Sequence, residues 1–254
     1  MCTLSLLRNG NDWLITMNRD EARDRHEGQL QIRQHGTLHY CYPLDLRAEG
    51  SWFGFNQQGI AAALLNRYQD PQALHKQSRG ALVPMLLQHA DVDAALQQLR
   101  AQQLSQFNPF DLLLFANRQQ WHLSWNGQQA SWQQLDSPDS WILSSSSFET
   151  DATLAFRYQH FEAWLTQTKA EETEALADQI LGDFHLNRDD PIRSVMMDRE
   201  IAHSKSICQL LLSSNRKQLR YFDETSLNLS REGVSPSELP RRLVTFKPNP
   251  KEAL

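Results

Sequence analysis

The sequence has few cysteines and no closely spaced cysteine pair. Its three cysteines, Cys2, Cys41 and Cys208, are far apart, and none belongs to a Cys-x-x-Cys motif. Zinc ribbons and dithiol redox centres are built from such pairs. The sequence therefore predicts neither of these sites.

Long hydrophobic runs and basic clusters are also lacking. No stretch approaches the roughly 18 apolar residues of a membrane-spanning helix, and the start has no charged and apolar segments typical of a secretory signal. The formal net charge is −5, and no segment gathers Lys and Arg as in nucleic-acid-binding proteins. We expect a cytoplasmic protein with a small-molecule ligand, no membrane span and no nucleic-acid partner.

The nine histidines form no metal-binding pattern. Only His35 and His39 are four residues apart, and Gly36 lies between them in a segment with no helical character. Zinc sites need several ligands at suitable spacing, so we expect no metal site. No motif indicates a bound cofactor either.

Length and composition are those of one compact domain over residues 1–254. Hydrophobic residues make up 40% of the chain and charged residues 22%, which is ordinary for a folded domain. A chain of this length buries a substantial core. No linker, repeat or low-complexity tract interrupts it.

Cys2 is the strongest candidate for a catalytic residue. If Met1 is removed, one residue carries both a thiol and a free α-amine, whose ordinary pKa values are about 8.5 and 7.7–8.0. Either a thiolate then lies beside an ammonium, or the amine takes the thiol proton during attack. Because the reactive form is a free thiol, a reducing compartment is expected.

The residues after Cys2 predict a hairpin. Residues 2–8 alternate between apolar and polar side chains, residues 9–12 form an Asn- and Gly-rich turn, and residues 13–17 return as a second strand. This hairpin brings the tetrapeptide at residues 18–21, Asn-Arg-Asp-Glu, back alongside Cys2.

With Cys2 at its start and Asn-Arg-Asp-Glu at residues 18–21, the chain resembles the NRDE proteins, also called the transport-and-Golgi-organisation family. Any single motif is a weak signal, but their order and spacing are specific. The matching blocks are Met1-Cys2, Asn18 to Glu21 with Arg25, Gly50 to Gly54 with Gly59 and Ala61 to Asn66, Arg79-Gly80-x-Leu82-Val83, Phe107 to Leu112, Leu143-Ser144 with Glu149-Thr150, and Ser204 to Leu212.

That family in turn resembles N-terminal-nucleophile hydrolases of the bile-salt hydrolase and penicillin-acylase group. The resemblance implies an α+β fold, a four-layer αββα sandwich of two antiparallel sheets, and cleavage of amide bonds by an N-terminal Cys. It assigns Arg19 as the basic partner of Cys2 and either Asp20 or Glu21 as the acidic one. Asn66 resembles an oxyanion-hole donor, and one such donor contributes about 10²–10³ in rate.

Two positions depart from the family pattern. Ser145 stands where relatives carry an Asn, and Lys205 stands where they carry an Arg. A Ser hydroxyl is shorter than an Asn amide, and Lys lacks the planar fork of Arg. The prediction keeps both residues in the catalytic set, and it adds Asn18, Arg25 and Trp52 as substrate contacts.

Two functions from different classes remain open at this stage. The first is a cysteine amidohydrolase or acyltransferase, and the second is a non-catalytic protein that binds or carries haem or an acyl compound on the same fold. No cysteine precedes a proline, so the Cys-Pro motif of some haem sites is absent, which does not exclude haem binding.

The predicted elements run in the order strands, helices, strands, helices, strands, which favours two antiparallel sheets with helices outside. A polar loop with one short strand is predicted at residues 22–48. A helix at residues 151–168 is predicted to pack a stripe of Leu154, Tyr158, Phe161 and Leu165 against a sheet. The other predictions are hairpins at 51–66, 110–125 and 207–222, short strands at 141–143 and 243–246, and helices at 82–89, 91–103 and 170–181.

Overall fold

A computed structural model describes residues 1–135, 140–168 and 172–247 of the protein. By their contacts these residues form two compact units. The first comprises residues 1–24 and 140–245, and the second comprises residues 25–135 with 246–247. The single domain over 1–254 stays a prediction.

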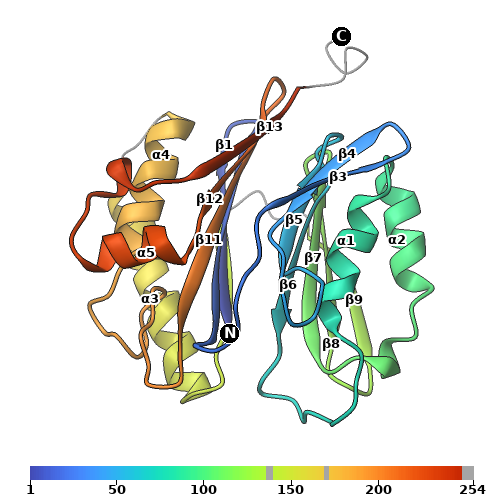
Figure 1. The fold of residues 1–254 in the computed structure, drawn as a ribbon, viewed down its shortest axis with the longest axis horizontal. Coiled ribbons are helices and arrows are strands. Elements are labelled where there is room, and N and C mark those ends of the chain that lie inside the picture. The colour runs from blue at the N-terminus through green and yellow to red at the C-terminus, as the bar shows by residue number, and fades with distance from the viewer. Residues whose placement is uncertain (136–139, 169–171, 248–254) are drawn as a thin grey trace. The chain divides into compact units, whose positions relative to one another are not determined.

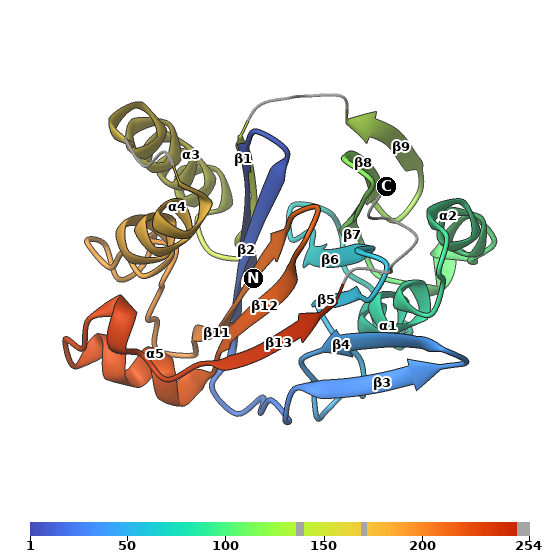
Figure 2. The same cartoon turned by 90° about the horizontal axis from the view of Figure 1, so that it is seen from above.

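The first unit is built on a six-stranded sheet with the order β10-β1-β2-β11-β12-β13. The pairs from β10 to β12 are antiparallel. Helices α3, α4 and α5 cover one face of this sheet (Figures 1 and 2). The strands are β1 (Cys2–Asn9), β2 (Asp12–Ala22), β10 (Trp141–Ser145), β11 (Ala202–Leu212), β12 (Lys217–Phe222) and β13 (Arg242–Phe246). The helices are α3 (Thr150–Gln167), α4 (Thr173–Ile180), the π-helical turn η3 (Leu181–His185), α5 (Glu224–Arg231) and the 3-10 turn η4 (Pro236–Glu238).

The second unit is a seven-stranded antiparallel meander, β3 to β9 in chain order. Helices α1 and α2 connect β6 to β7 and lie on one face of this sheet (Figure 1). The strands are β3 (Gln31–His35), β4 (Leu38–Tyr42), β5 (Phe53–Asn56), β6 (Ala61–Asn66), β7 (Phe110–Ala116), β8 (Gln119–Trp125) and β9 (Ala130–Leu135). The helices are η1 (Arg79–Ala81), α1 (Leu82–Leu87), α2 (Val92–Arg100) and η2 (Leu104–Gln106).

The fold class predicted from the sequence, α+β with two antiparallel sheets, is confirmed. The segment at residues 22–48 differs from its prediction, because it forms the paired strands β3 and β4 rather than a loop with one short strand. Residues 170–171, the predicted start of the fourth helix, lie outside the described residues.

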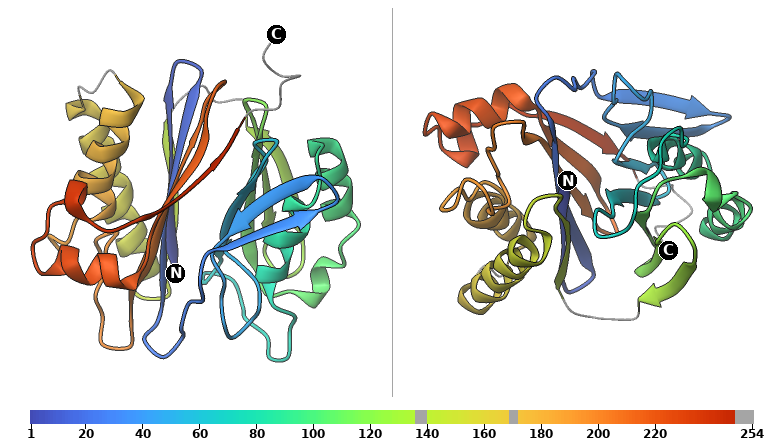
Figure 3. Two further views of the ribbon diagram at one scale, coloured as in Figure 1. Left: turned by 45° about the horizontal axis from the view of Figure 1, so that its top comes forward. Right: turned by 90° about the horizontal axis from the view of Figure 1, so that it is seen from below.

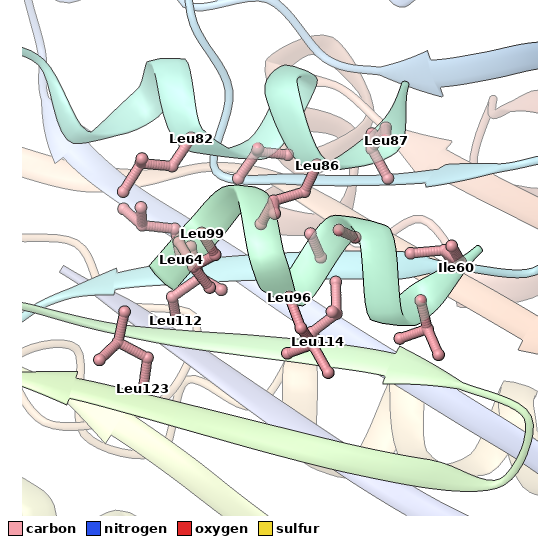
Figure 4. Packing of buried hydrophobic residues seen from close by; sticks show 14 of the residues in the cluster. Ile60, Leu64, Leu82, Leu86, Leu87, Leu96, Leu99, Leu112, Leu114 and Leu123 are labelled. Atoms are coloured by element: carbon pink, nitrogen blue, oxygen red, sulfur yellow. The ribbon is translucent and has the colours of Figure 1, made fainter. Parts of the chain in front are cut away.

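Helix α2 shows how the apolar pattern shapes the second unit. The Asp91 side chain caps it by accepting from the backbone N–H groups of Asp93 and Ala94. Its apolar side chains at helical spacing are all buried, as predicted. They pack with α1 onto β6, β7 and β8, and Figure 4 shows Leu96 and Leu99 facing Leu64, Leu112 and Leu114 in this core.

Helix α3 of the first unit is rotated relative to the prediction. Phe161 is buried, but Tyr158 is 37% and Leu165 is 39% exposed. The face turned to the sheet instead carries Thr153, Arg157, Phe161 and Trp164. Arg157 takes the central position because the sheet offers it hydrogen-bond acceptors, so the predicted apolar stripe was wrong.

The opening hairpin is confirmed, and it positions the candidate site. Asn9 pairs with Asp12, which leaves a two-residue turn. Gly10 in that turn has a φ of 58°, a left-handed conformation that glycine adopts without a steric penalty. The turn fixes the register of β1 on β2, and therefore fixes which residue lies opposite Cys2.

Candidate active site

Cys2 begins β1, with a neighbouring strand on each side. Its register partner on β2 is Arg19, and its partner on β10 is Ser145. Figure 3 shows the two blue strands of the opening hairpin side by side. The sheet thus gathers Cys2, Arg19 and Ser145 from segments far apart in sequence.

The backbone pattern brings Cys2 and Arg19 close together. Met1 and Asp20 exchange two hydrogen bonds, since the Asp20 N–H donates to the Met1 carbonyl at 2.8 Å and the Met1 ammonium donates to the Asp20 carbonyl at 2.8 Å. Hydrogen-bonded and non-hydrogen-bonded pairs alternate along an antiparallel ladder. Cys2 and Arg19 therefore form a non-hydrogen-bonded pair, in which the side chains share a face at the shorter separation.

The two acidic candidates lie on opposite faces of the sheet. Successive side chains of a strand alternate between faces. Glu21 is on the face of Cys2 and forms an ion pair with Arg19 at 3.5 Å. The Asp20 carboxylate is on the helix-covered face, where it accepts from the Ser204 hydroxyl at 2.6 Å. The Glu21 carboxylate thus contacts Arg19 directly, whereas Asp20 contacts Met1 through its backbone N–H and carbonyl groups.

The surroundings of the Cys2 thiol act on its pKa in both directions. Burial raises the pKa of Cys2, while the terminal ammonium and Arg19 lower it and the Asp20 carboxylate adds to the increase. Burial is the strongest of these effects. With Met1 in place, the neutral thiol is favoured, and the nucleophile needs a proton acceptor.

Arg19→Ala is expected to slow the alkylation of Cys2 near pH 7 by roughly three- to tenfold. The loss of a nearby cation raises the thiol pKa and lowers the thiolate fraction. The measurement is the rate of iodoacetamide labelling, with peptide mass spectrometry to assign the site. Glu21→Gln is the matched control and is expected to label as fast as the wild type or faster. Equal or faster labelling of Arg19→Ala would contradict the pairing.

Ser145 holds the nitrogen of Cys2. The Cys2 backbone N–H donates to the Ser145 Oγ at 3.1 Å. Removal of Met1 would turn this nitrogen into the α-amine, next to the same hydroxyl. Ser145 therefore serves as a partner of the amine although relatives carry an Asn here.

A buried polar layer lies between the sheet and α3. Arg157 is its centre and has a fully buried side chain, 3.6 Å from the Asp20 carboxylate. Its guanidinium donates to the hydroxyls of Thr3 and Ser144 and to the carbonyls of Arg193 and Ser194. Arg157 therefore supports the strand ends that carry Cys2 and Asp20.

Ser5, His185 and Asn18 form a second buried group in this layer. His185 Nε2 lies 2.7 Å from the Ser5 Oγ, and Nδ1 lies 2.6 Å from the Asn18 Oδ1. The spacing is that of a nucleophile, a base and an orienting group, but all three residues have 0% exposure. Because no solvent reaches them, we interpret the group as structural support. Asn18, predicted as a substrate contact, is held here and also donates to the His185 carbonyl at 2.9 Å.

Stability is expected to fall on acidification because of His185. Burial lowers the pKa of His185 to about 3, whereas an unfolded histidine has a pKa of about 6.5. The neutral ring stabilises the fold fully above pH 6.5, and the contribution is lost as the pH falls toward 3. Between pH 7 and pH 4.5 this loss is about 2–3 kcal/mol. Urea unfolding at both pH values should show this loss. In His185→Gln, the free energy of unfolding should depend less steeply on pH.

Lys205 lies at a β-bulge in β11, between Ser204 and Ser206. Its Nζ donates to Glu224 at 3.1 Å and to the Arg23 carbonyl at 2.9 Å. The bulge puts Ser206, not Lys205, opposite Arg19. The charge of Lys205 is therefore matched by Glu224 at the start of α5.

The remaining predicted residues belong to the second unit. Asn66 ends β6, and its amide donates to the Tyr68 hydroxyl at 2.9 Å. Arg25 forms an ion pair with Asp45 at 2.8 Å, and Trp52 is buried. The first unit thus places Arg19 and Ser145 next to Cys2, with Glu21 on Arg19. Asn66, Arg25 and Trp52 belong to the second unit.

A sequence comparison identifies the family of this chain. The family model described as Transport and Golgi organisation 2 matches residues 1–221. The chain belongs to this family. A search of curated proteins finds no match.

One solved structure shows the same fold at low sequence identity, and a second one matches less well. A Caenorhabditis elegans N-acylethanolamine-hydrolyzing acid amidase ortholog matches with a TM-score of 0.55 at 12% identity, over 82% of this chain and 92% of that one. A variant of conjugated bile acid hydrolase from Clostridium perfringens matches with a TM-score of 0.48 at 10% identity, over 98% of this chain and 97% of that one. The predicted resemblance of this family member to N-terminal-nucleophile hydrolases is confirmed for the fold.

Sequence reasoning missed Arg157, His185 and Arg199, which contact Thr3, Ser5 and Met1 respectively. Each is an isolated polar residue, and no motif or spacing distinguishes it from a surface residue. Within residues 1–135, 140–168 and 172–247, no group of three or more His, Cys, Asp or Glu side chains is arranged to hold a metal ion. No helix in these ranges is both long and apolar enough to cross a membrane.

Proposed function

We propose that the protein is a cysteine N-terminal-nucleophile hydrolase, active after removal of Met1, that cleaves a carbon–nitrogen amide bond of a small molecule. The observation that carries the proposal is the placement of Cys2 between Arg19 and Ser145 at the start of β1. Two further supports are the family membership and the fold shared with an amidase ortholog.

Each group near Cys2 has a role in the proposed reaction. The α-amine of Cys2 takes the thiol proton as the sulfur attacks the amide carbon, and Ser145 orients that amine. Arg19 stabilises the thiolate, and Glu21 holds Arg19 in position. The family resemblance assigns Asn66 the role of an oxyanion-hole donor, and that role stays a prediction.

The second half of the reaction returns the enzyme to its starting state. The ammonium of Cys2 gives its proton to the leaving amine as the carbon–nitrogen bond breaks, which leaves a thioester on Cys2. The amine then takes a proton from water as the water attacks the thioester. Release of the carboxylic acid restores the thiol.

Removal of Met1 is the step on which this chemistry depends. While Met1 is attached, the Cys2 nitrogen is a peptide N–H that donates to Ser145, and a peptide nitrogen is not a base. Met1 is itself only 8% exposed and fills the space next to Cys2. The Met1 form is therefore expected to be inactive.

The test compares two forms of the same protein, with intact mass used to assign each form. One begins at Cys2, produced by a protease that cleaves a leader directly before it, and the other retains Met1. Against a panel of N-acyl amides, only the Cys2 form is expected to release amine. Turnover by both forms, or by neither, would contradict the proposal. Binding of haem or an acyl compound without turnover would favour the non-catalytic alternative.

A further inference from the structure

The Met1 side chain occupies a site whose polar groups suit a stronger acceptor. Its sulfur lies 3.0 Å from Nη1 of Arg199 and 3.3 Å from the Ser147 Oγ. The Ser146 Oγ is 3.9 Å away. A thioether sulfur is a weak hydrogen-bond acceptor. The Ser146 hydroxyl already donates to the Phe148 carbonyl at 2.9 Å, so two good donors, Arg199 Nη1 and the Ser147 hydroxyl, converge on a group that satisfies them poorly.

Arg199 is a half-buried cation to which no carboxylate of the described residues is directly bonded. Its Nε and Nη2 donate to the Ile192 carbonyl at 2.9 and 2.7 Å, and its guanidinium carbon lies 5.1 Å from the centre of the Phe148 ring. The carboxylates of Asp20, Asp190 and Glu149 act on its charge electrostatically. In the described part of the chain, however, these carboxylates form ion pairs with Arg157 and Arg193 rather than with Arg199. The Met1 sulfur is the partner of Nη1. Since arginine stays protonated, this edge is a ready position for an anion.

Loss of Met1 would open this position directly beside the nucleophile. Adjacent Cα atoms are about 3.8 Å apart across a trans peptide bond, so the vacated space adjoins Cys2. The Asp20 N–H, which now donates to the Met1 carbonyl, would also lose its partner. Buried donors left without an acceptor destabilise the protein, so the space favours a ligand with strong acceptors.

We propose that the space filled by Met1 is a substrate subsite that binds a carboxylate. One carboxylate oxygen accepts from Nη1 of Arg199, and the other accepts from the Ser147 hydroxyl. A carboxylate suits the site because the Ile192 carbonyl takes Nε and Nη2, and Nη2 also donates to the Ser146 Oγ at 3.4 Å, which leaves Nη1 for a small monoanion. The substrates are then amides that carry a carboxylate a few atoms from the reacting carbonyl. This inference rests on the proposed function, because it requires the form that begins at Cys2.

The test measures alkylation of Cys2 by two matched probes, N-bromoacetylglycine and its uncharged glycinamide analogue. The thiolate displaces bromide from either probe, and only the first carries a carboxylate. In the protein that begins at Cys2, the ratio of the two rate constants is expected to fall about tenfold on Arg199→Gln. Arg199→Lys, which keeps the charge, should retain part of the preference.

A neighbouring arginine supplies the control. Arg193 is partly exposed and forms an ion pair with Glu149 at 2.6 Å, and Arg193→Gln is expected to leave the ratio unchanged. An equal fall in both variants would indicate general attraction of anions and would overturn the subsite. An identical ratio in the wild type and in Arg199→Gln would also overturn the subsite.

Two further arms keep the result interpretable. If Arg199→Gln does not fold, as judged by circular dichroism, Ser147→Ala should lower the ratio about threefold, and an unchanged ratio would overturn the proposal. Alkylation needs no turnover, so a shifted ratio without amide hydrolysis would contradict the proposed function and support the subsite. Hydrolysis with an unshifted ratio would contradict the subsite alone.

Discussion

Cys2→Ala is expected to lower amide hydrolysis by at least about 10³-fold, because it removes the only atom proposed to attack the substrate carbon. The measurement is kcat for any amide that the form beginning at Cys2 turns over. Cys2→Ser keeps the shape of the side chain and is expected to retain at most a trace of activity, since a hydroxyl is a weaker nucleophile.

Cys41 provides the matched control for Cys2. It is fully buried, and burial raises the pKa of Cys41 to about 12, so its thiol is neither ionised nor accessible. Cys41→Ala is expected to keep kcat per folded molecule unchanged. Full turnover in Cys2→Ala, or an equal loss in both variants, would remove Cys2 from the mechanism.

Arg157→Met is expected to lower the free energy of unfolding by about 3–5 kcal/mol, the usual consequence of removing one partner of a buried charged pair. The substitution leaves the fully buried Asp20 carboxylate without the cation 3.6 Å away. It also removes the guanidinium donor from two backbone carbonyls and from the Thr3 and Ser144 hydroxyls, which keep only their bond to each other at 2.8 Å. Urea unfolding at pH 7 measures the effect.

A double variant separates the charge from the packing. When Asp20→Asn is added to Arg157→Met, the unpaired buried charge disappears, and part of the lost stability is expected to return. Arg193→Met is the control, since its ion pair with Glu149 is partly exposed on both sides and contributes little to stability. A loss in Arg157→Met no larger than in this control would refute the supporting role of the buried layer.

The parts of the site that depend on local sequence were predictable. The alternating pattern of residues 2–8 and the turn at residues 9–12 set the β1–β2 hairpin, and the hairpin sets the pairing of Cys2 with Arg19. The choice between Asp20 and Glu21 needed the register, because one step along a strand changes the face. The structure assigns Glu21 to the face of Cys2.

Long-range polar contacts set the rest, and no sequence pattern encodes them. Periodicity in α3 favoured the stripe that includes Tyr158 and Leu165, yet Arg157 turns to the sheet because hydroxyls and carbonyls from distant segments satisfy its donors. The bulge at Lys205 shifts the register of β11 by one residue, and only the pairing with β2 reveals it. The family resemblance therefore assigned Lys205 to the site, whereas the backbone puts Ser206 opposite Arg19.

The peptide bond between Met1 and Cys2 also acts as a chemical protecting group. An amino-terminal cysteine is a 1,2-aminothiol, and aldehydes condense with such groups to give a five-membered thiazolidine ring that consumes the amine and the sulfur together. In the Met1 form the nitrogen is acylated and hydrogen-bonded to Ser145, so this condensation has no starting point. The trimmed protein therefore acquires sensitivity to formaldehyde and related carbonyl compounds at the same moment as its nucleophile.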